Sequence, residues 1–248
     1  MDLVSVIIPY YRKRNYVKES LVSVINQSHD NLEVLIIYDD TNLNDFEFLK
    51  KFEKLDHRIK IIKNSVKLGA GFSRNLGIEK SKGKYIAFLD ADDTWSPDKL
   101  KSQISFMEQN NCKVSHTSYY IIDEKKKITG QRKARNLFSV NDILKSCDIG
   151  LSTVVLEKNI VVHNKIKFPG LVTKEDFVFW LEILKKKYKI YAQDKYMTNW
   201  TDLKNSLSSS TAQKLMDGFK VYYYHMNFNI FKSIYYLFCL SLNYLKKR

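Results

Sequence analysis

The first hundred residues alternate short apolar runs with amphipathic segments, and this alternation limits the folds that the chain can adopt. The apolar runs and the helical segments follow one another at residues 3–9, 17–27, 32–39, 45–54, 59–63, 71–80 and 85–90. A further helix is predicted to open at Pro97, with Ser96 as its cap. Strand–helix–strand units in this order predict a mostly parallel sheet with helices on its faces.

Length and composition predict one packed α/β domain inside the cell. A chain of 248 residues, of which 44% are hydrophobic, can bury a full core. Cys112, Cys147 and Cys239 lie far apart and without a CxxC pair, so neither a disulfide framework nor a zinc site is expected. The N-terminus enters an apolar strand within three residues, and we therefore predict no signal peptide and a cytoplasmic location.

The formal net charge of +14 predicts affinity for polyanions without choosing among them. Nucleic acid, acidic lipid headgroups and the diphosphate of an activated substrate would all be attracted. A basic nucleic-acid-binding protein is therefore one alternative at this point.

The second half of the chain has a less regular pattern. It predicts a strand at 114–122, a basic loop at 124–135, a second strand at 152–156 and a helix from 175 onward. A polar serine-rich segment at 205–211 and an aromatic tail at 219–245 follow. The tail closes with Lys246, Lys247 and Arg248.

Polar residues follow three of the predicted strands at the point where each strand ends. These clusters are Pro9–Tyr11, Asp39–Asp40 and Asp90–Asp93. Ligands of open α/β sheets bind beyond the carboxyl ends of the strands, so we expect the three clusters to meet on one rim.

Each cluster has a chemical and a structural interpretation. The acidic turn Asp90–Asp93 could supply carboxylates to Mg²⁺, or could cap the next helix. Arg74 could meet a phosphate or be an ordinary surface cation. Asp39 or Asp40 could accept a hydrogen bond from a base or a ribose, or could cap a loop.

The order of these motifs resembles that of the glycosyltransferase family 2 enzymes, which have the GT-A fold. The matching residues are Val4–Pro9 with Tyr11, Ser23–Val24, Asn26–Ser28, Val34–Asp40, Gly69, Ser73–Asn75, Gly77, Gly83–Ile86, Phe88–Trp95, Pro97 and Leu100. The resemblance covers about the first 110 residues densely. It implies a Rossmann-like sheet with a nucleotide-binding half at 1–110, an acceptor-binding half at 111–200 and a C-terminal helical tail at 201–248.

The resemblance also implies a nucleotide-sugar donor and assigns residues to it. The base, uracil or an equivalent, would stack near Pro9 and Tyr11 and be read by Asp39 or Asp40. Arg74 would approach the nucleotide and Asp90 would lie by the ribose. Asp92 would hold Mn²⁺ or Mg²⁺ against the diphosphate, with Asp93 as a less certain partner.

The sequence departs from the family pattern at two loops. Arg12 stands where these enzymes usually have Asn, and Thr41–Asn42 stands in place of a Gly–Ser pair. Because the glycine is missing, we expect Asn42 to adopt the left-handed conformation instead.

Glu175–Asp176, followed by Trp180, looks like the family's acidic pair at the start of a helix. Asp176 is then the candidate general base, held as a carboxylate by the helix dipole; simple N-capping is the alternative. Asp176 would take the acceptor proton while the hydroxyl attacks the sugar, and inversion of the anomeric configuration is implied. We expect a glycan or lipid-linked acceptor, in the synthesis of a surface polysaccharide or a lipid-linked glycan, and no nucleic acid.

Residues 230–245 mix aromatic and aliphatic side chains but are short for a membrane span. The segment could lie on an anionic membrane, which would place the enzyme at the inner face, or could pack on the domain or on a second subunit. The oligomeric state is left open. An inactive relative of the family is a further alternative, although the carboxylates of Asp92 and Asp176 are both present.

Overall fold

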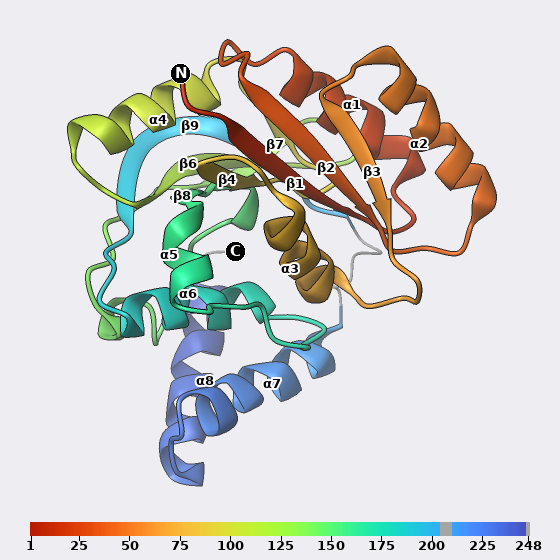
Figure 1. The fold of residues 1–248 in the computed structure, drawn as a ribbon. Helices are drawn as coiled ribbons and strands as arrows, with labels where there is room; N and C mark the ends of the chain where they lie inside the picture. Colours follow the sequence, from red (N-terminus) through yellow and green to blue (C-terminus); the bar gives the residue numbers. More distant parts are fainter. Residues whose placement is uncertain (204–209, 247–248) are drawn as a thin grey trace.

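The computed structural model describes residues 1–203 and 210–246, and its strands form a single sheet (Figure 1). In the described residues the strands are β1 (Val4–Tyr10), β2 (Leu32–Tyr38), β3 (Ile59–Lys63), β4 (Tyr85–Phe88), β5 (Thr94–Trp95), β6 (Val114–Ile122), β7 (Ile128–Arg132), β8 (Val155–Glu157) and β9 (Tyr191–Thr201). Their order in the sheet is β3-β2-β1-β4-β8-β6-β9-β5, with β7 paired to β6. The predicted mixed α/β fold is therefore confirmed.

Helices cover both faces of the sheet. They are α1 (Arg14–Ile25), α2 (Leu43–Leu55), α3 (Ala70–Lys80), α4 (Lys99–Gln109), α5 (Lys158–His163), α6 (Glu175–Lys185), α7 (Thr211–Lys220) and α8 (Ile230–Leu245). Figure 1 shows α1 and α2 on one side of β1–β3 and α3 on the other. Short 3₁₀ turns lie at Val140–Asp142 and Leu151–Thr153, and a π-helical turn lies at Val221–His225.

Two hydrophobic cores lie on opposite faces of the sheet because the strand side chains alternate. In β1, Ile7 belongs to one core, while Val6 and Ile8 belong to the other. Both faces of a parallel sheet are covered, so its strands read as continuous apolar runs, and every residue of β2 is buried. Gly77 of α3 packs so closely on Ile7 that any Cβ would overlap that side chain.

The sheet reverses its strand order between β1 and β4, and this reversal positions the site. Strands β2 and β3 extend from β1 in one direction, and β4 lies on its other side; all four are parallel. The pairing of β1 with β4 ends at Ile7, so Pro9 extends past the end of β4. The crevice at such a reversal is where ligands of open α/β sheets bind.

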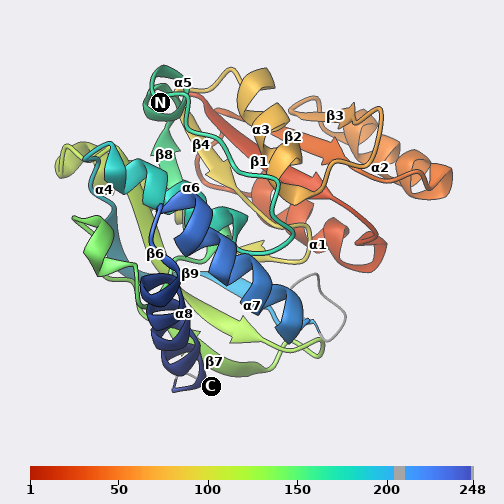
Figure 2. The same cartoon turned by 90° about the horizontal axis from the view of Figure 1, so that it is seen from below.

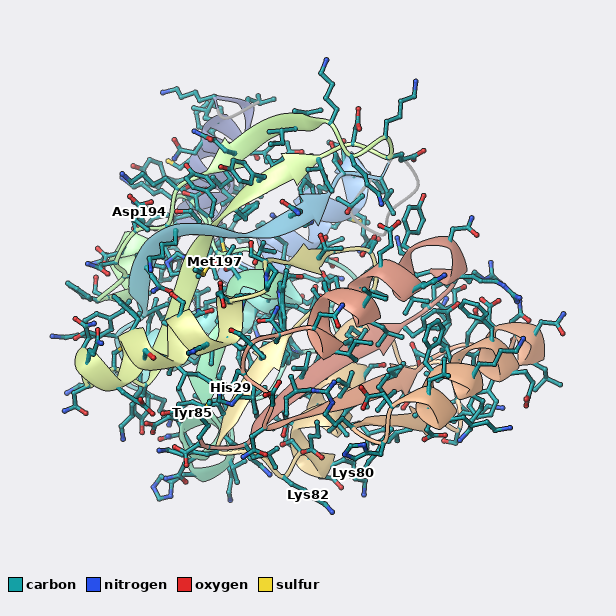
Figure 3. All side chains as sticks on the ribbon, turned by 90° about the horizontal axis from the view of Figure 1, so that it is seen from above. His29, Lys80, Lys82, Tyr85, Asp194 and Met197 are labelled. Carbon is teal, nitrogen blue, oxygen red and sulfur yellow. The ribbon has the colours of Figure 1, made fainter. Side chains whose placement is uncertain are left out.

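The amino ends of the strands lie at a different edge, which Figure 3 shows. Tyr85, which begins β4, shares that edge with Lys80 and Lys82. Asp194 and Met197 lie apart from it, on the long strand β9.

Three local predictions need correction. The basic loop predicted at 124–135 contains β7, which pairs antiparallel with β6. Helix α4 begins at Lys99 rather than at Pro97, and its N-cap is Asp98 without a side-chain cap bond, because Pro97 and Asp98 form a turn. The second strand predicted at 152–156 is divided, since Leu151–Thr153 forms a 3₁₀ turn before β8.

The C-terminal segment packs on α6 through one side of its helices. Tyr222 is buried in the larger core, where its ring lies 6.0 Å from that of Phe177, and its hydroxyl donates to Leu144 O at 2.6 Å. Figure 1 shows α7 and α8 together at one end of the molecule, and Figure 2 looks at that end from below. Most of the predicted serine-rich segment and the final two basic residues lie outside the described residues. Among the residues described, no helix has the length and apolar character that crossing a membrane requires.

Candidate active site

The acidic turn Asp90–Asp93 follows β4 and is held in place from two neighbouring elements. Ser20 Oγ of α1 donates to Ala91 O at 2.9 Å, and Thr201 Oγ1 of β9 donates to Asp92 O. The turn itself is closed by Asp93 N, which donates to Asp90 O at 3.0 Å. These bonds fix the turn at the carboxyl end of β4.

Asp93 is the buried member of the turn. Its carboxyl oxygens accept hydrogen bonds from Ser152 Oγ at 2.5 Å and from Thr201 N at 2.9 Å. Burial, followed by the charges of Asp92 and Asp90, raises the pKa of Asp93 well above its ordinary value. A carboxyl group with these partners fastens the turn to the rest of the sheet.

Asp92 is less buried and has a cation as its partner. Lys13 Nζ donates to Asp92 Oδ2 at 2.7 Å, and the side chains of the two residues are 23% and 15% exposed, respectively. Burial and then the charge of Asp90 raise the pKa of Asp92, while Lys13 lowers it. Asp92 therefore keeps access to solvent and needs a positive partner.

Arg74 of α3 is buried between two carboxylates from different parts of the chain. Its guanidinium donates to Asp90 Oδ1 and to Glu175 Oε1, each at 2.7 Å. Burial lowers the pKa of Arg74, but Asp90 and Glu175 more than offset this and raise it above its ordinary value. The same side chain thus joins the acidic turn to the start of α6.

Asp176 lies on the first turn of α6, and burial dominates its surroundings. Burial raises the pKa of Asp176, Lys174 and Arg74 lower it, and Asp90 raises it further. Dipole stabilisation of the carboxylate was expected to dominate, but loss of hydration outweighs it. In the described residues, the hydrogen-bond donor to its carboxylate is the backbone N–H of Phe177 at 2.7 Å.

Glu175 differs from its neighbour because it is paired with Arg74. Burial and the charge of Asp176 nevertheless raise the pKa of Glu175 to about 7, against the lowering effect of Arg74. The two adjacent carboxyl groups therefore have different partners, and Asp176 is the one without a side-chain donor in the described part of the chain.

Asp39 and Asp40, at the end of β2, also differ from each other. The carboxylate of Asp39 accepts three hydrogen bonds at 2.7 Å, from Asn64 Nδ2, Leu68 N and Gly69 N. It therefore closes the loop before α3. Asp40 Oδ1 accepts from Thr41 N, while Asp40 Oδ2 is buried without a hydrogen-bond partner in the described residues.

Tyr11 lies at the end of β1 with cations around its ring. Lys67 Nζ lies 3.9 Å from the ring centroid and Arg12 Cζ lies 5.1 Å from it. Arg12 has φ +51°, so Arg12 rather than Asn42 is left-handed beside Tyr11. The expectation for Asn42 was wrong: its φ is −72°, and its side chain caps α2 by accepting from Asn44 N and Asp45 N.

The structure brings most of the predicted site residues together, and Arg74 and its contacts connect them. Asp90, Asp92 and Asp176 surround one rim, while Pro9, Tyr11 and Asp39–Asp40 lie at the ends of β1 and β2 beside it.

Sequence reasoning missed Lys13 as the partner of Asp92, and it missed Ser152 and Thr201 as the partners of Asp93. The basic run at 12–14 is the signal that could have pointed to Lys13. Ser152 and Thr201 come from distant segments and carry no local signal.

The electrostatics of the rim suit a cation. Five carboxyl groups, those of Asp90, Asp92, Asp93, Glu175 and Asp176, lie near three cationic side chains, those of Lys13, Arg74 and Lys174. The described residues hold no cluster of three or more His, Cys, Asp or Glu side chains that could hold a metal ion. A hard divalent ion commonly takes one or two protein carboxylates and completes its shell with phosphate oxygens and water. Asp92 fits such a site, provided that the ion displaces Lys13.

Comparison with known proteins identifies what the chain is similar to. The sequence model of the family described as Glycosyl transferase family 2 matches residues 5–162. TuaG of Bacillus subtilis, whose name assigns it provisionally to teichuronic acid biosynthesis, is 31% identical over 99% of this chain and 97% of its own length. The Escherichia coli UDP-Glc:alpha-D-GlcNAc-diphosphoundecaprenol beta-1,3-glucosyltransferase WfgD is 39% identical over 74% of this chain and 70% of its own.

Two solved structures share the fold. Residues 1–349 of S. aureus TarS, in complex with UDP-GlcNAc, match 90% of this chain and 67% of that chain, with a TM-score of 0.71 and 20% identity. The mannosyltransferase PcManGT from Pyrobaculum calidifontis, in complex with GDP-Man and Mn²⁺, matches 94% of this chain and 69% of its own chain, with a TM-score of 0.69 and 12% identity.

Proposed function

We propose, from the premise that the chain belongs to glycosyl transferase family 2, that it moves one hexosyl or hexosaminyl group from a nucleotide-diphosphate donor to an acceptor hydroxyl. The observation that carries the proposal is the position of Arg74. By binding Asp90 and Glu175 at once, it places the acidic turn and the start of α6 on either side of one rim. A donor and an acceptor can meet there.

Asp176 is the proposed general base. Its pKa is raised, which brings it closer to neutral pH, and Glu175 rather than Asp176 carries the ion pair with Arg74. Asp176 accepts the proton of the acceptor hydroxyl as the oxygen attacks the sugar. A single displacement from the face opposite the leaving nucleotide inverts the anomeric configuration.

Asp92 is the proposed holder of Mn²⁺ or Mg²⁺. When bound, the ion would neutralise the charge that develops on the departing diphosphate. Asp90, held by Arg74, is placed to accept from the ribose. Asp40 is the better of the two candidates for reading the base, because its Oδ2 lies buried without a hydrogen bond in the described residues, 3.8 Å from Arg12 Nε, while Asp39 is committed to its own loop.

A UDP-sugar is the proposed donor and a lipid-linked glycan the proposed acceptor. The name of WfgD gives UDP-Glc and a diphosphoundecaprenol acceptor, and TarS is solved with UDP-GlcNAc. Pro9 and the cation-flanked ring of Tyr11 are the proposed stacking surface for uracil. The enzyme would act in the cytoplasm at the inner face of the membrane, in peripheral contact through residues 201–248, as part of surface polysaccharide or lipid-linked glycan synthesis.

The test is a panel of UDP-, GDP- and dTDP-sugars with Mn²⁺, read by thermal shift and by donor hydrolysis. One UDP-sugar should raise the melting temperature and be hydrolysed only with the metal, and NMR of the transferred product should show the inverted anomer. Absence of stabilisation or turnover with every donor, or a product with retained configuration, would overturn the proposal. An inactive relative would bind a donor without hydrolysing it.

A further inference from the structure

Helix α8 has apolar side chains on two sides, and the protein covers one of them. Ser233 and Leu240 are buried, the ring of Tyr236 stacks 5.6 Å from that of Tyr222, and Asn243 Nδ2 donates to Lys145 O at 2.9 Å. These contacts hold α8 against the domain.

The other side carries a row of exposed apolar residues with helical spacing. The exposed fractions of this row are 85% for Phe231, 53% for Ile234, 51% for Tyr235, 61% for Phe238, 40% for Leu242 and 64% for Leu245. Ile234, Tyr235 and Phe238 lie three, four and seven residues after Phe231. Leu242 follows four residues after Phe238, and Leu245 three residues after Leu242, so the six side chains form one stripe along α8. We call these six residues the α8 row.

The α8 row is too continuous to be the scattered surface hydrophobicity of an ordinary soluble protein. Contiguous exposed apolar patches commonly mark interaction sites. In the described residues from 211 to 246, the one acidic side chain is Asp217, which is buried and bound to Thr173. A lysine lies beside the row, since Lys145 Nζ is 5.6 Å from the ring of Tyr235. A second, Lys214, lies 5.3 Å from the ring of Tyr244, which belongs to α8 but not to the row.

We propose that the α8 row docks the enzyme onto the surface of an anionic lipid bilayer. Apolar side chains flanked by lysines suit the boundary between acyl chains and acidic headgroups, where aromatic rings and lysine ammonium groups are both accommodated. The net charge of +14 attracts the chain to such a surface. A second copy of this chain fits less well, because a two-fold interface would bring lysines onto lysines, and the described residues from 211 to 246 offer no exposed carboxylate to pair them.

The docking face connects to the proposed acceptor side of the active site. Asp217 of α7 accepts hydrogen bonds from Thr173 N at 3.0 Å and from Thr173 Oγ1 at 3.1 Å. Thr173 lies three residues before Asp176, so α7 supports the loop that leads to the proposed base. This part of the inference rests on the proposed function, since a lipid-linked acceptor would be presented at that surface.

The test is co-sedimentation with vesicles of phosphatidylglycerol and, separately, of phosphatidylcholine. The wild-type chain should bind phosphatidylglycerol, and high salt should weaken that binding. The triple variant Phe231→Ser, Ile234→Ser, Phe238→Ser should lose about tenfold or more in affinity, because each removed side chain gives up its apolar contact.

The matched control is Leu55→Ser, Ile128→Ser, Val162→Ser. These residues are exposed to similar extents, at 82%, 55% and 53%, but come from three separate elements. It should bind vesicles as the wild type does. Far-UV circular dichroism and melting temperature establish that each variant folds. A second variant, Lys214→Gln with Lys232→Gln, keeps the α8 row and should reduce both the affinity and its salt dependence.

Equal binding to both lipids, or a triple variant that binds like the wild type, would overturn the proposal. So would a wild-type dimer that binds no vesicles and that the triple variant converts to a monomer by light scattering. Donor hydrolysis without vesicles separates this from the proposed function: it should be the same in the wild type and the triple variant. Vesicle binding without any donor turnover would refute the proposed function alone.

Discussion

Lys13 Nζ lies 2.7 Å from Asp92 Oδ2, so the carboxylate proposed for the metal already holds a cation that belongs to the chain. Lys13 is the N-cap residue of α1, and the pair joins it to the turn after β4, 79 residues later. Lys13 therefore acts as an internal counter-ion, and a divalent ion has to replace it at Asp92.

Replacing Lys13 by Met should tighten the binding of Mn²⁺ in the absence of donor. The partly buried pair is worth about 1 kcal/mol, which corresponds to about a fivefold lower Kd. Isothermal titration with Mn²⁺ alone measures the effect. Lys18→Met, an exposed lysine on the same α1 surface, is the control and should leave the Kd unchanged. Weaker binding by Lys13→Met would show that Lys13 assists the metal instead.

Asp92→Ala and Asp93→Ala should fail in different ways. Asp92→Ala should lose metal-dependent nucleotide binding and keep its stability, because Asp92 pairs with a partly exposed lysine. Asp93→Ala should lower the free energy of unfolding by about 2 kcal/mol, since it leaves buried Ser152 and Thr201 N–H without their acceptor. Urea unfolding and nucleotide titration with Mn²⁺ distinguish them. If Asp92→Ala still bound nucleotide in a metal-dependent manner, the assignment of Asp92 would fail.

Asp176→Asn should keep donor binding and lose transfer by a factor of about 100 to 10,000, because the amide cannot accept the acceptor proton. The rate of transfer and the donor Kd are measured on the same preparation. Asp98→Asn, an exposed carboxylate outside the rim, serves as the control. Transfer at the normal rate by Asp176→Asn would show that another group is the base.

The pH dependence of transfer should report the raised pKa of Asp176. A base works when it is deprotonated, so the rate should fall as the pH decreases through that pKa. The charge of Lys174 lowers the pKa of Asp176, so Lys174→Gln, which removes that charge, should raise it. The acid limb of kcat/KM should therefore move to higher pH by about half a unit.

Glu182→Gln is the control for this shift, since Glu182 lies on the same helix but pairs with Lys185 at the surface. Its acid limb should coincide with that of the wild type. An acid limb that Lys174→Gln leaves in place, or moves to lower pH, would contradict the effect of Lys174 on Asp176.

The sequence was sufficient to predict the sheet and to predict that the carboxyl ends of its first strands meet at one rim. Buried parallel strands such as β2 are largely apolar, so they stand out, and their carboxyl ends must meet at one rim. Strand β7 was missed because Ile128–Arg132 lies exposed at the edge of the sheet, with little hydrophobic pattern to mark it. Tertiary pairing with β6, rather than local preference, makes it a strand.

The residues near the site could be predicted from the sequence, but the hydrogen bonds between them could not. Asp39 and Asp40 look alike in sequence, yet the loop at 64–69 satisfies Asp39, while Asp40 Oδ2 accepts no hydrogen bond from the described residues. Burial, which decides the pKa of Asp176, depends on the packing of segments that sequence spacing cannot place.

The two hydrogen bonds of Arg74 mean that the donor and acceptor halves cannot respond independently. A nucleotide that changes the position or charge of Asp90 alters the guanidinium, and the guanidinium in turn alters Glu175 beside the base. Thermodynamic reciprocity then requires that an acceptor settling at α6 changes the affinity for the nucleotide by the same factor. On the proposed function, each substrate should therefore change the affinity for the other, whichever of them binds first.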